Sequence, residues 1–329
     1  MMKRLYNYLI INLVAILLAS CGTDLEPEIF PNRTIANGYI TSFNTGSVEK
    51  IFVSESKIYF YSQGTERLIT YDLAARTTSE MEIQMEVDES IDEGGYLGEE
   101  YRRYLLDNLA NINSLRPGGG FWYNGKGYVV TWDRIYIFSP ETSTWTYSDM
   151  NQTQYVDGND VSNSVFINNQ MIQISASSIY YFSPETMTWR KENITRLFQD
   201  LSNRKTLLVG NENKLYAYDY YEKSLYLYDF ASNLWQEMEL NLNSYMSGEI
   251  NCVLMNGNNL YLWISSNDMT FWELDLSKSS NNIVMINVAP EYYSQILYSD
   301  FRVFNIGNTC YKLCSDNQLI PALFEFELK

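Results

Sequence analysis

The chain of 329 residues contains no histidine. Because imidazole is the base in Ser-His-Asp and Cys-His nucleophiles, its absence excludes both kinds of catalytic group. It also excludes every zinc or copper site that needs a histidine ligand. Acid–base chemistry would have to come from Asp, Glu, Tyr or Lys. From these residue types we predict no cofactor.

Basic residues, glycine and proline are also scarce. The chain has 23 Lys and Arg against 40 Asp and Glu, a formal net charge of -17, and only 17 Gly and 7 Pro beside 28 Tyr. A surface this acidic repels phosphate backbones, so we predict no nucleic-acid partner. The many tyrosines and the 46% of hydrophobic residues predict a packed, strand-rich core.

The four cysteines give little room for disulfides. If Cys21 carries a lipid, Cys252, Cys310 and Cys314 remain, and three thiols allow at most one internal bond. On one extended strand Cys310 and Cys314 would lie about 13 Å apart, too far to bridge. We expect buried thiols, with a bond only if a tight turn separates the last two.

The N-terminus has the layout of a secretory signal over residues 1–20. Two cations precede an apolar run over residues 9–18, which is short for a membrane span. The sequence Leu-Ala-Ser-Cys that ends at Cys21 resembles a bacterial lipobox. The resemblance implies cleavage before Cys21 and a diacylglycerol on its thiol, which would bind the protein to a membrane. The alternative is an ordinary signal peptide followed by a chance cysteine.

Residues 21–36 are expected to form a tether. The stretch "GTDLEPEIFPN" is acidic, contains proline and has no periodicity. It resembles the surface-export signal of lipoproteins from one group of anaerobic Gram-negative bacteria. That resemblance implies an exported protein, anchored to the outer membrane and exposed at the cell surface, whereas the simpler interpretation is a solvated tether.

A repeated segment dominates the rest of the chain. "RIYIFSPETSTW" begins at residue 134 and "SIYYFSPETMTW" begins at residue 178, which is 178 − 134 = 44 residues later. Fainter copies begin at residues 67, 224, 270 and 322. Each copy has a strand, a Ser or Asp that can bond the backbone two residues on, and a turn residue such as proline. The repeat therefore predicts a hairpin between two antiparallel strands.

The strands before these turns are apolar on both faces, so each sheet should be covered on both sides. A second series of turns, rich in Asn and Gly, precedes them and adds another hairpin to every unit. Four strands in about 45 residues match one propeller blade. We predict an all-β, six-bladed β-propeller over residues 37–329, with Trp145, Trp189 and Trp235 packed between blades.

The repeat resembles a Kelch-type β-propeller, related to the galactose-oxidase central domain. The matching features are the apolar-Tyr strand, the Asp or Ser, the Thr and the three tryptophans. The paired glycines of many Kelch repeats are absent. The sixth unit ends after its third strand, so we predict that residues 37–43 pair with residues 322–328 and close the ring.

Residues 86–115 form an insertion in the first repeat. From Glu99 onward the apolar spacing predicts a short helix. The acids over residues 86–100 offer oxygen ligands for Ca²⁺, although their spacing is not that of an EF-hand loop. The interpretation we favour is a solvated decoration that packs one helix on the propeller.

The loops that reach one face of the ring carry the candidate ligand residues. Aromatic rings beside amide and acid groups suit stacking on sugar faces and hydrogen bonding to hydroxyls, although they are also ordinary loop composition. The candidates are Trp132, Asp133, Asp157, Asn159, Arg204, Tyr220, Tyr221, Asp268 and Arg302, together with Arg116, Glu249, Asn267 and Asp316.

Three functions fit this sequence. The first is a lipid-anchored surface protein, without catalysis, whose propeller face holds a glycan or a protein partner. The second is a sugar-processing enzyme, because some Kelch-type propellers are sialic acid mutarotases and sialidases are also six-bladed. The sialidase signature is not met by "SNDMTFW", and copper-dependent galactose oxidation needs histidines. The third is a scaffold subunit of a surface complex.

Overall fold

The structure is a computed structural model of the chain. It describes residues 32–35, 38–43, 48–62, 65, 67–87, 105, 120–130, 134–149, 164–175, 178–193, 206–211, 214–219, 224–232, 234–238, 249–265, 270–277, 283–288, 303–315 and 320–328.

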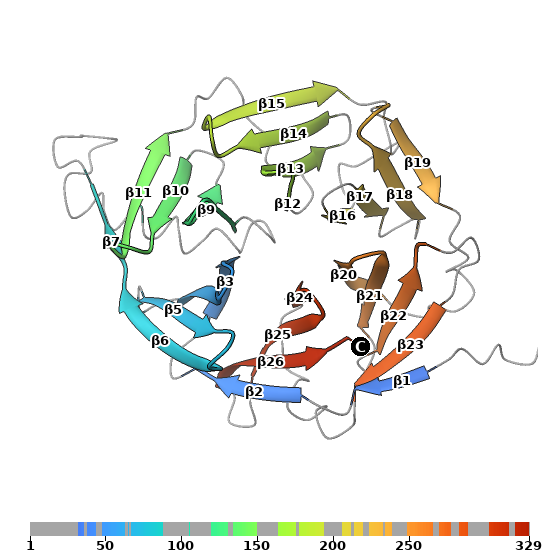
Figure 1. The fold of residues 1–329 in the computed structure, drawn as a ribbon, viewed down its shortest axis with the longest axis horizontal. Coiled ribbons are helices and arrows are strands. Elements are labelled where there is room, and N and C mark those ends of the chain that lie inside the picture. The colour runs from blue at the N-terminus through green and yellow to red at the C-terminus, as the bar shows by residue number, and fades with distance from the viewer. Residues whose placement is uncertain are drawn as a thin grey trace, which may run out of the picture.

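Six sheets are arranged radially in a ring, which confirms the predicted six-bladed β-propeller (Figure 1). From the innermost to the outermost strand, the first three blades are β3 (Val48–Val53), β4 (Lys57–Ser62), β5 (Arg67–Asp72) and β6 (Thr77–Glu82); β8 (Gly120–Tyr123), β9 (Lys126–Val130), β10 (Arg134–Ser139) and β11 (Thr144–Asp149); and β12 (Val165–Ile167), β13 (Gln170–Ser175), β14 (Ser178–Ser183) and β15 (Thr188–Asn193). The other three are β16 (Thr206–Asn211), β17 (Lys214–Asp219), β18 (Ser224–Asp229) and β19 (Leu234–Met238); β20 (Glu249–Asn256), β21 (Asn259–Ser265), β22 (Thr270–Asp275) and β23 (Ile283–Val288); and β24 (Val303–Ile306), β25 (Thr309–Ser315), β26 (Pro321–Glu327) and β2 (Gly38–Ser42).

The N-terminal strand β2 closes the ring, as predicted. It pairs antiparallel with β26, in a register that runs from Gly38 opposite Phe326 to Ser42 opposite Ala322. The N–H of Phe43 extends the pairing by donating to the carbonyl of Pro321 over 2.7 Å. The last blade is thus built from both ends of the chain.

Two short strands were not predicted. Strand β1 (Asn32–Ile35) pairs parallel with β23, and β7 (Gln84–Met85) pairs parallel with β11. The assignment of residues 32–35 to a tether is therefore wrong. The outermost strand of a blade offers unpaired N–H and C=O groups, which a passing segment satisfies without any hydrophobic periodicity of its own.

The core lies between blades, because the strands before the repeated turn are largely buried on both faces, as predicted, whereas outermost strands such as β6 and β15 are mostly exposed. Trp145 lies in a cluster with Phe52 and Tyr59 of the first blade, and Trp189 lies with Phe121 and Tyr128 of the second. Trp235 packs against the cluster between the third and fourth blades. All three tryptophans thus join neighbouring blades.

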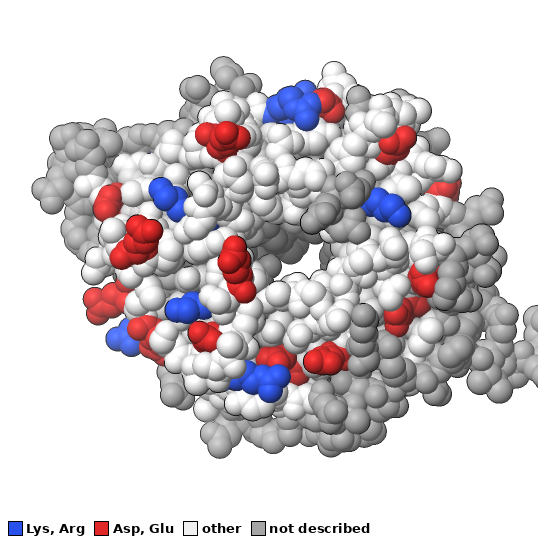
Figure 2. All heavy atoms as spheres, viewed as in Figure 1, with Lys and Arg blue, Asp and Glu red and all other residues white. Residues whose placement is uncertain are grey.

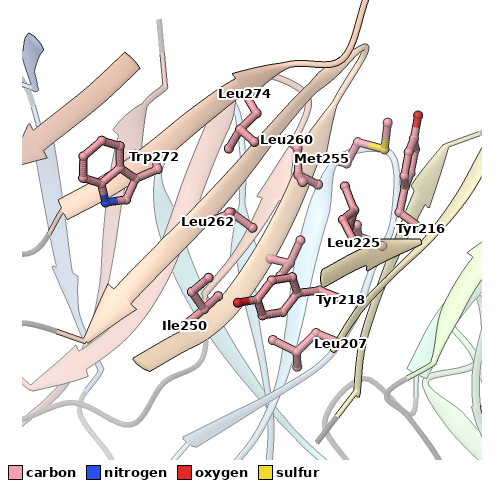
Figure 3. Packing of buried hydrophobic residues seen from close by; sticks show 12 residues of the cluster. Leu207, Tyr216, Tyr218, Leu225, Ile250, Met255, Leu260, Leu262, Trp272 and Leu274 are labelled. Atoms are coloured by element: carbon pink, nitrogen blue, oxygen red, sulfur yellow. The ribbon is translucent and has the colours of Figure 1, made fainter. Parts of the chain in front are cut away.

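Figure 3 shows one of these clusters, between the fourth and fifth blades. Tyr218 from β17 points toward Ile250 and Leu262 of the fifth blade. The sheets meet through such interdigitated side chains, so neighbouring blades share a common core.

The predicted insertion lies almost wholly outside the described residues. Leu105 is described, and it is buried in the cluster between the first two blades. The helix and the calcium site stay predictions. Cys252 and Cys310 carry thiols and form no disulfide. Burial raises the pKa of the Cys310 thiol.

Candidate functional site

The antiparallel order gives the ring two different faces. On the hairpin face lie the turns between the first and second and between the third and fourth strands of each blade. On the loop face lie the ends of the second strands, the starts of the third strands and the passages from blade to blade. Ser62 and Asp219 mark the loop face in the first and fourth blades, and Asn124 marks the hairpin face in the second.

The hairpin face is made of short, internally bonded turns. Oδ1 of Asp72 accepts the N–H groups of Ala74 and Ala75 over 3.0 and 2.8 Å. Asp229 and Asp275 likewise accept an N–H from two residues on, as predicted for this repeat position. Backbone donors hold the pKa of Asp72 and of Asp229 below the usual value for aspartate. These carboxylates therefore stabilise their own turns on the hairpin face.

Buried polar side chains gather instead at the loop face. Of the buried polar or charged residues of the described chain, Ser62, Arg134, Ser178 and Asp219 lie at the loop-face ends of their strands, and Ser164 lies directly before β12. The others lie within their strands: Thr70, Gln173, Lys312 and Glu325. Because burying a polar group costs free energy unless it is hydrogen-bonded, a ring of such groups indicates a built polar layer beneath the loops.

The strand registers place these groups at two levels. Ser62 and Asp219 are the last residues of β4 and β17, whereas Gln173 and Lys312 lie two and three residues before the ends of β13 and β25. Lys312 lies opposite Val303, the first residue of β24, and Asp219 lies opposite Thr206, the first residue of β16. Nε2 of Gln173 donates to Oγ of Ser164 over 2.7 Å, directly before β12 begins. The polar layer therefore lies near the ends of the strands at the loop face.

Two cations of this layer lie on aromatic rings. Nζ of Lys312 is 4.2 Å from the centroid of Trp263 in the next blade, and the Arg134 guanidinium is 5.9 Å from that of Tyr147. Both cations are nearly removed from water, at 6% and 7% exposure. A ring face stabilises a desolvated cation by about 2 kcal/mol. The arrangement places fixed positive charge under the loop face of an acidic protein.

The predicted ligand residues themselves lie outside the described residues, as does Cys21; only the backbone of Glu249 is described. Their described neighbours are at the loop face. Arg134 follows the candidates at 132 and 133, Asp219 precedes those at 220 and 221, and Val303 follows the one at 302. The candidates thus stay predictions.

Sequence reasoning missed Lys312 and Gln173. Each interrupts an otherwise apolar strand, in "TCYKLC" and "QMIQIS". A polar residue inside a strand covered on both sides is the signal that could have identified both.

Figure 2 shows one face of the ring, hollowed at its centre, with acidic and basic groups scattered over the blades. Among the described residues, no group of three Asp, Glu or Cys side chains could hold a metal ion. Within the same residues, no helix has the length and apolar character needed to cross a membrane.

No family model and no curated protein matches the chain. Solved structures show the fold. A protein of unknown function from Bacteroides thetaiotaomicron is 9% identical, with a TM-score of 0.51 over 88% of this chain and 76% of its own. U3-55K is 7% identical, with a TM-score of 0.51 over 88% of this chain and 98% of its own.

The extracellular domain of a putative one-component system from B. thetaiotaomicron is 12% identical over 87% of this chain, with a TM-score of 0.46. Our chain spans 34% of that protein's length. The two structures with a TM-score of 0.51 show the propeller fold alone.

Proposed function

We propose that this protein is a lipid-anchored binding protein of the bacterial outer membrane, exposed at the cell surface, whose loop face holds a glycan or a protein partner. The observation that carries the proposal is the polar layer at the loop face. Buried charged groups such as Arg134 and Asp219 lie at the strand ends there, with Gln173 and Lys312 two to three residues deeper, whereas the carboxylates of the hairpin face are occupied by their own turns.

The polar layer suits binding because its groups are fixed before a ligand arrives. Preorganised donors lose little conformational entropy on binding. Indole and phenol rings at positions 132, 220 and 221 would add stacking surfaces above it. The Kelch-like repeat and the lipobox at Cys21 support the same proposal, and they rest on the sequence.

The test has two parts. Mass spectrometry of the native protein should show a mature chain that begins at Cys21 and carries a diacylglycerol. The domain from residue 32 onward should then be applied to a glycan array and, in parallel, used to capture partners from outer-membrane extract. Saturable binding to one glycan class or one protein supports the proposal, and turnover of a bound sugar would instead favour a sugar-processing enzyme.

A further inference from the structure

The N-terminal chain joins the propeller at its rim. Strand β1 lies on the outer edge of β23 in the fifth blade, and β2 then lies on the outer edge of β26 in the sixth. Figure 1 shows both strands on the outside of the ring, beside each other in the lower part of the view. A tether at the N-terminus therefore attaches to this part of the rim.

The same part of the rim carries no acidic residue on its outermost strands. The strands β1 ("NRTI"), β2 ("GYITS") and β23 ("IVMINV") contain one cation, Arg33, and no Asp or Glu. The chain as a whole has 40 acids in 329 residues. Other outermost strands carry acids, as in β6 ("TTSEME") and β15 ("TWRKEN").

The neighbouring strand β26 carries two acids, and only one of them is exposed. Oε1 of Glu325 accepts a hydrogen bond from Arg76 over 2.6 Å, and its side chain is 8% exposed. Glu327 is exposed, and it lies at the end of β26, one residue past Phe326, the last residue that pairs with β2. The patch made by β1, β2 and β23, called the anchor rim below, is therefore nearly neutral.

Tyr39 projects from the anchor rim. It is 43% exposed, and the Arg76 guanidinium lies 5.2 Å from its ring centroid. Tyrosine and arginine are the side chains that suit a lipid–water interface, because each combines an apolar body with a polar end. Leu234 of the fourth blade is the other large hydrophobic residue that is exposed among the described residues.

The geometry points to the anchor rim as the surface that faces the lipid headgroups, with the ring standing on its edge. This inference rests on the proposed lipid anchor at Cys21. From there to Asn32 the chain spans at most about 40 Å when fully extended. A globule of this size is about 50 Å across. The tether therefore keeps the fifth and sixth blades nearest the membrane, and the loop face opens sideways to solvent.

The experiment uses the chain from residue 21 onward, held by an N-terminal histidine tag on phosphatidylcholine vesicles that contain a nickel-chelating lipid. The photo-crosslinker p-benzoylphenylalanine replaces Tyr39 in one variant. It replaces Leu234 or, in the blade opposite the sixth, Thr188 in two matched controls, which are also exposed. The yield of protein–lipid adduct is measured by mass spectrometry.

We expect at least a fivefold higher adduct yield at position 39 than at positions 188 and 234. Equal yields at the three positions, or a higher yield at either control, would overturn the inference. Circular dichroism of each variant checks that the fold is retained. Because the tag supplies the anchor, this result is independent of native lipidation, which mass spectrometry of the native protein tests separately.

Discussion

The Oη atom of Tyr71 donates a hydrogen bond over 2.9 Å to Oε2 of Glu325, 254 residues further along the chain. Tyr71 belongs to the first blade and Glu325 to the sixth, so this bond crosses the seam where the ring closes. Arg76 adds a second donor to the same carboxylate. The seam thus joins the two ends of the chain through a buried, charge-assisted contact as well as through β2.

We predict that Glu325→Gln lowers the free energy of unfolding by about 1–3 kcal/mol, because a buried carboxylate with two donors becomes a weaker amide acceptor. Urea unfolding followed by tryptophan fluorescence measures the change. Glu80→Gln is the matched control, since its ion pair with Arg67 is 2.9 Å long but exposed. The control should change stability by less than about 0.5 kcal/mol. Equal losses of stability in the two variants would show that the bonds to Glu325 stabilise the seam no more than an exposed ion pair does.

Alkaline pH should weaken the fold. Burial raises the pKa of Tyr71, and the neighbouring Glu325 raises it further. Burial also raises the pKa of Tyr311, to about 12. Unfolded tyrosine titrates near 10. A raised folded pKa contributes stability that is complete below pH 10 and is lost as pH rises toward 12. Circular dichroism against pH should show this loss, and Tyr311→Phe should make it shallower. A flat profile between pH 10 and 12 would contradict the prediction.

Gly127 lets the second blade approach the first. A Cβ atom at this position would lie 2.2 Å from Cζ of Phe52, whose ring is fully buried. We predict that Gly127→Ala costs about 1–3 kcal/mol, because the overpacked ring must shift. Phe52→Leu in the same chain should recover part of that loss, so a double-mutant cycle in urea should give a clear coupling energy. If the stability changes of Gly127→Ala and Phe52→Leu add strictly, the two positions are not energetically coupled, which would contradict the prediction.

The turn residues Arg76 and Ser143 both have positive φ, at 55° and 58°. Ser143→Gly should raise the free energy of unfolding by about 1 kcal/mol, because glycine adopts this conformation without strain. Arg76→Gly removes the same strain but also the bond to Glu325, so it should give no gain. Thermal unfolding of the two variants side by side tests this difference. A gain from Arg76→Gly equal to that from Ser143→Gly would mean that the ion pair adds nothing.

Ring closure by β2 should be essential for cooperative unfolding. Deletion of residues 1–43 exposes the edge of β26 and removes the buried Phe43, so the Tm should fall by on the order of 10 °C. Deletion of residues 1–31 leaves every described strand in place and should leave the Tm unchanged. Calorimetry distinguishes the two. If the protein without residues 1–43 keeps its Tm and unfolds cooperatively, ring closure by β2 is not essential.

The blades were predictable because their signals are local. Turn residues such as Asp72 and Asn124 act on their own backbone, and strands like β10 show in their own letters that both faces are covered. Ring closure followed from counting strands in the last repeat. These features need no knowledge of which segments meet across the ring.

Other features depend on distant partners and were missed. Strand β1 has no pattern of its own and exists because the edge of β23 is open. The place of Lys312 on Trp263 depends on how two blades meet. The candidate ligand residues were predicted in loops, where aromatic, amide and acid groups are ordinary, so the sequence suggests a face and no particular ligand.

Binding by the loop face is the central claim, and paired surface variants test it most directly. The combined variant Trp132→Ala, Tyr220→Ala and Arg302→Ala changes residues predicted to lie at the loop face, and Lys126→Ala with Glu185→Ala changes the hairpin face. The affinity of each for the ligand found on the array or in the extract is measured by calorimetry. We predict at least a tenfold loss for the first and no change for the second. An unchanged affinity in the first variant, or a loss confined to the second, would contradict the account.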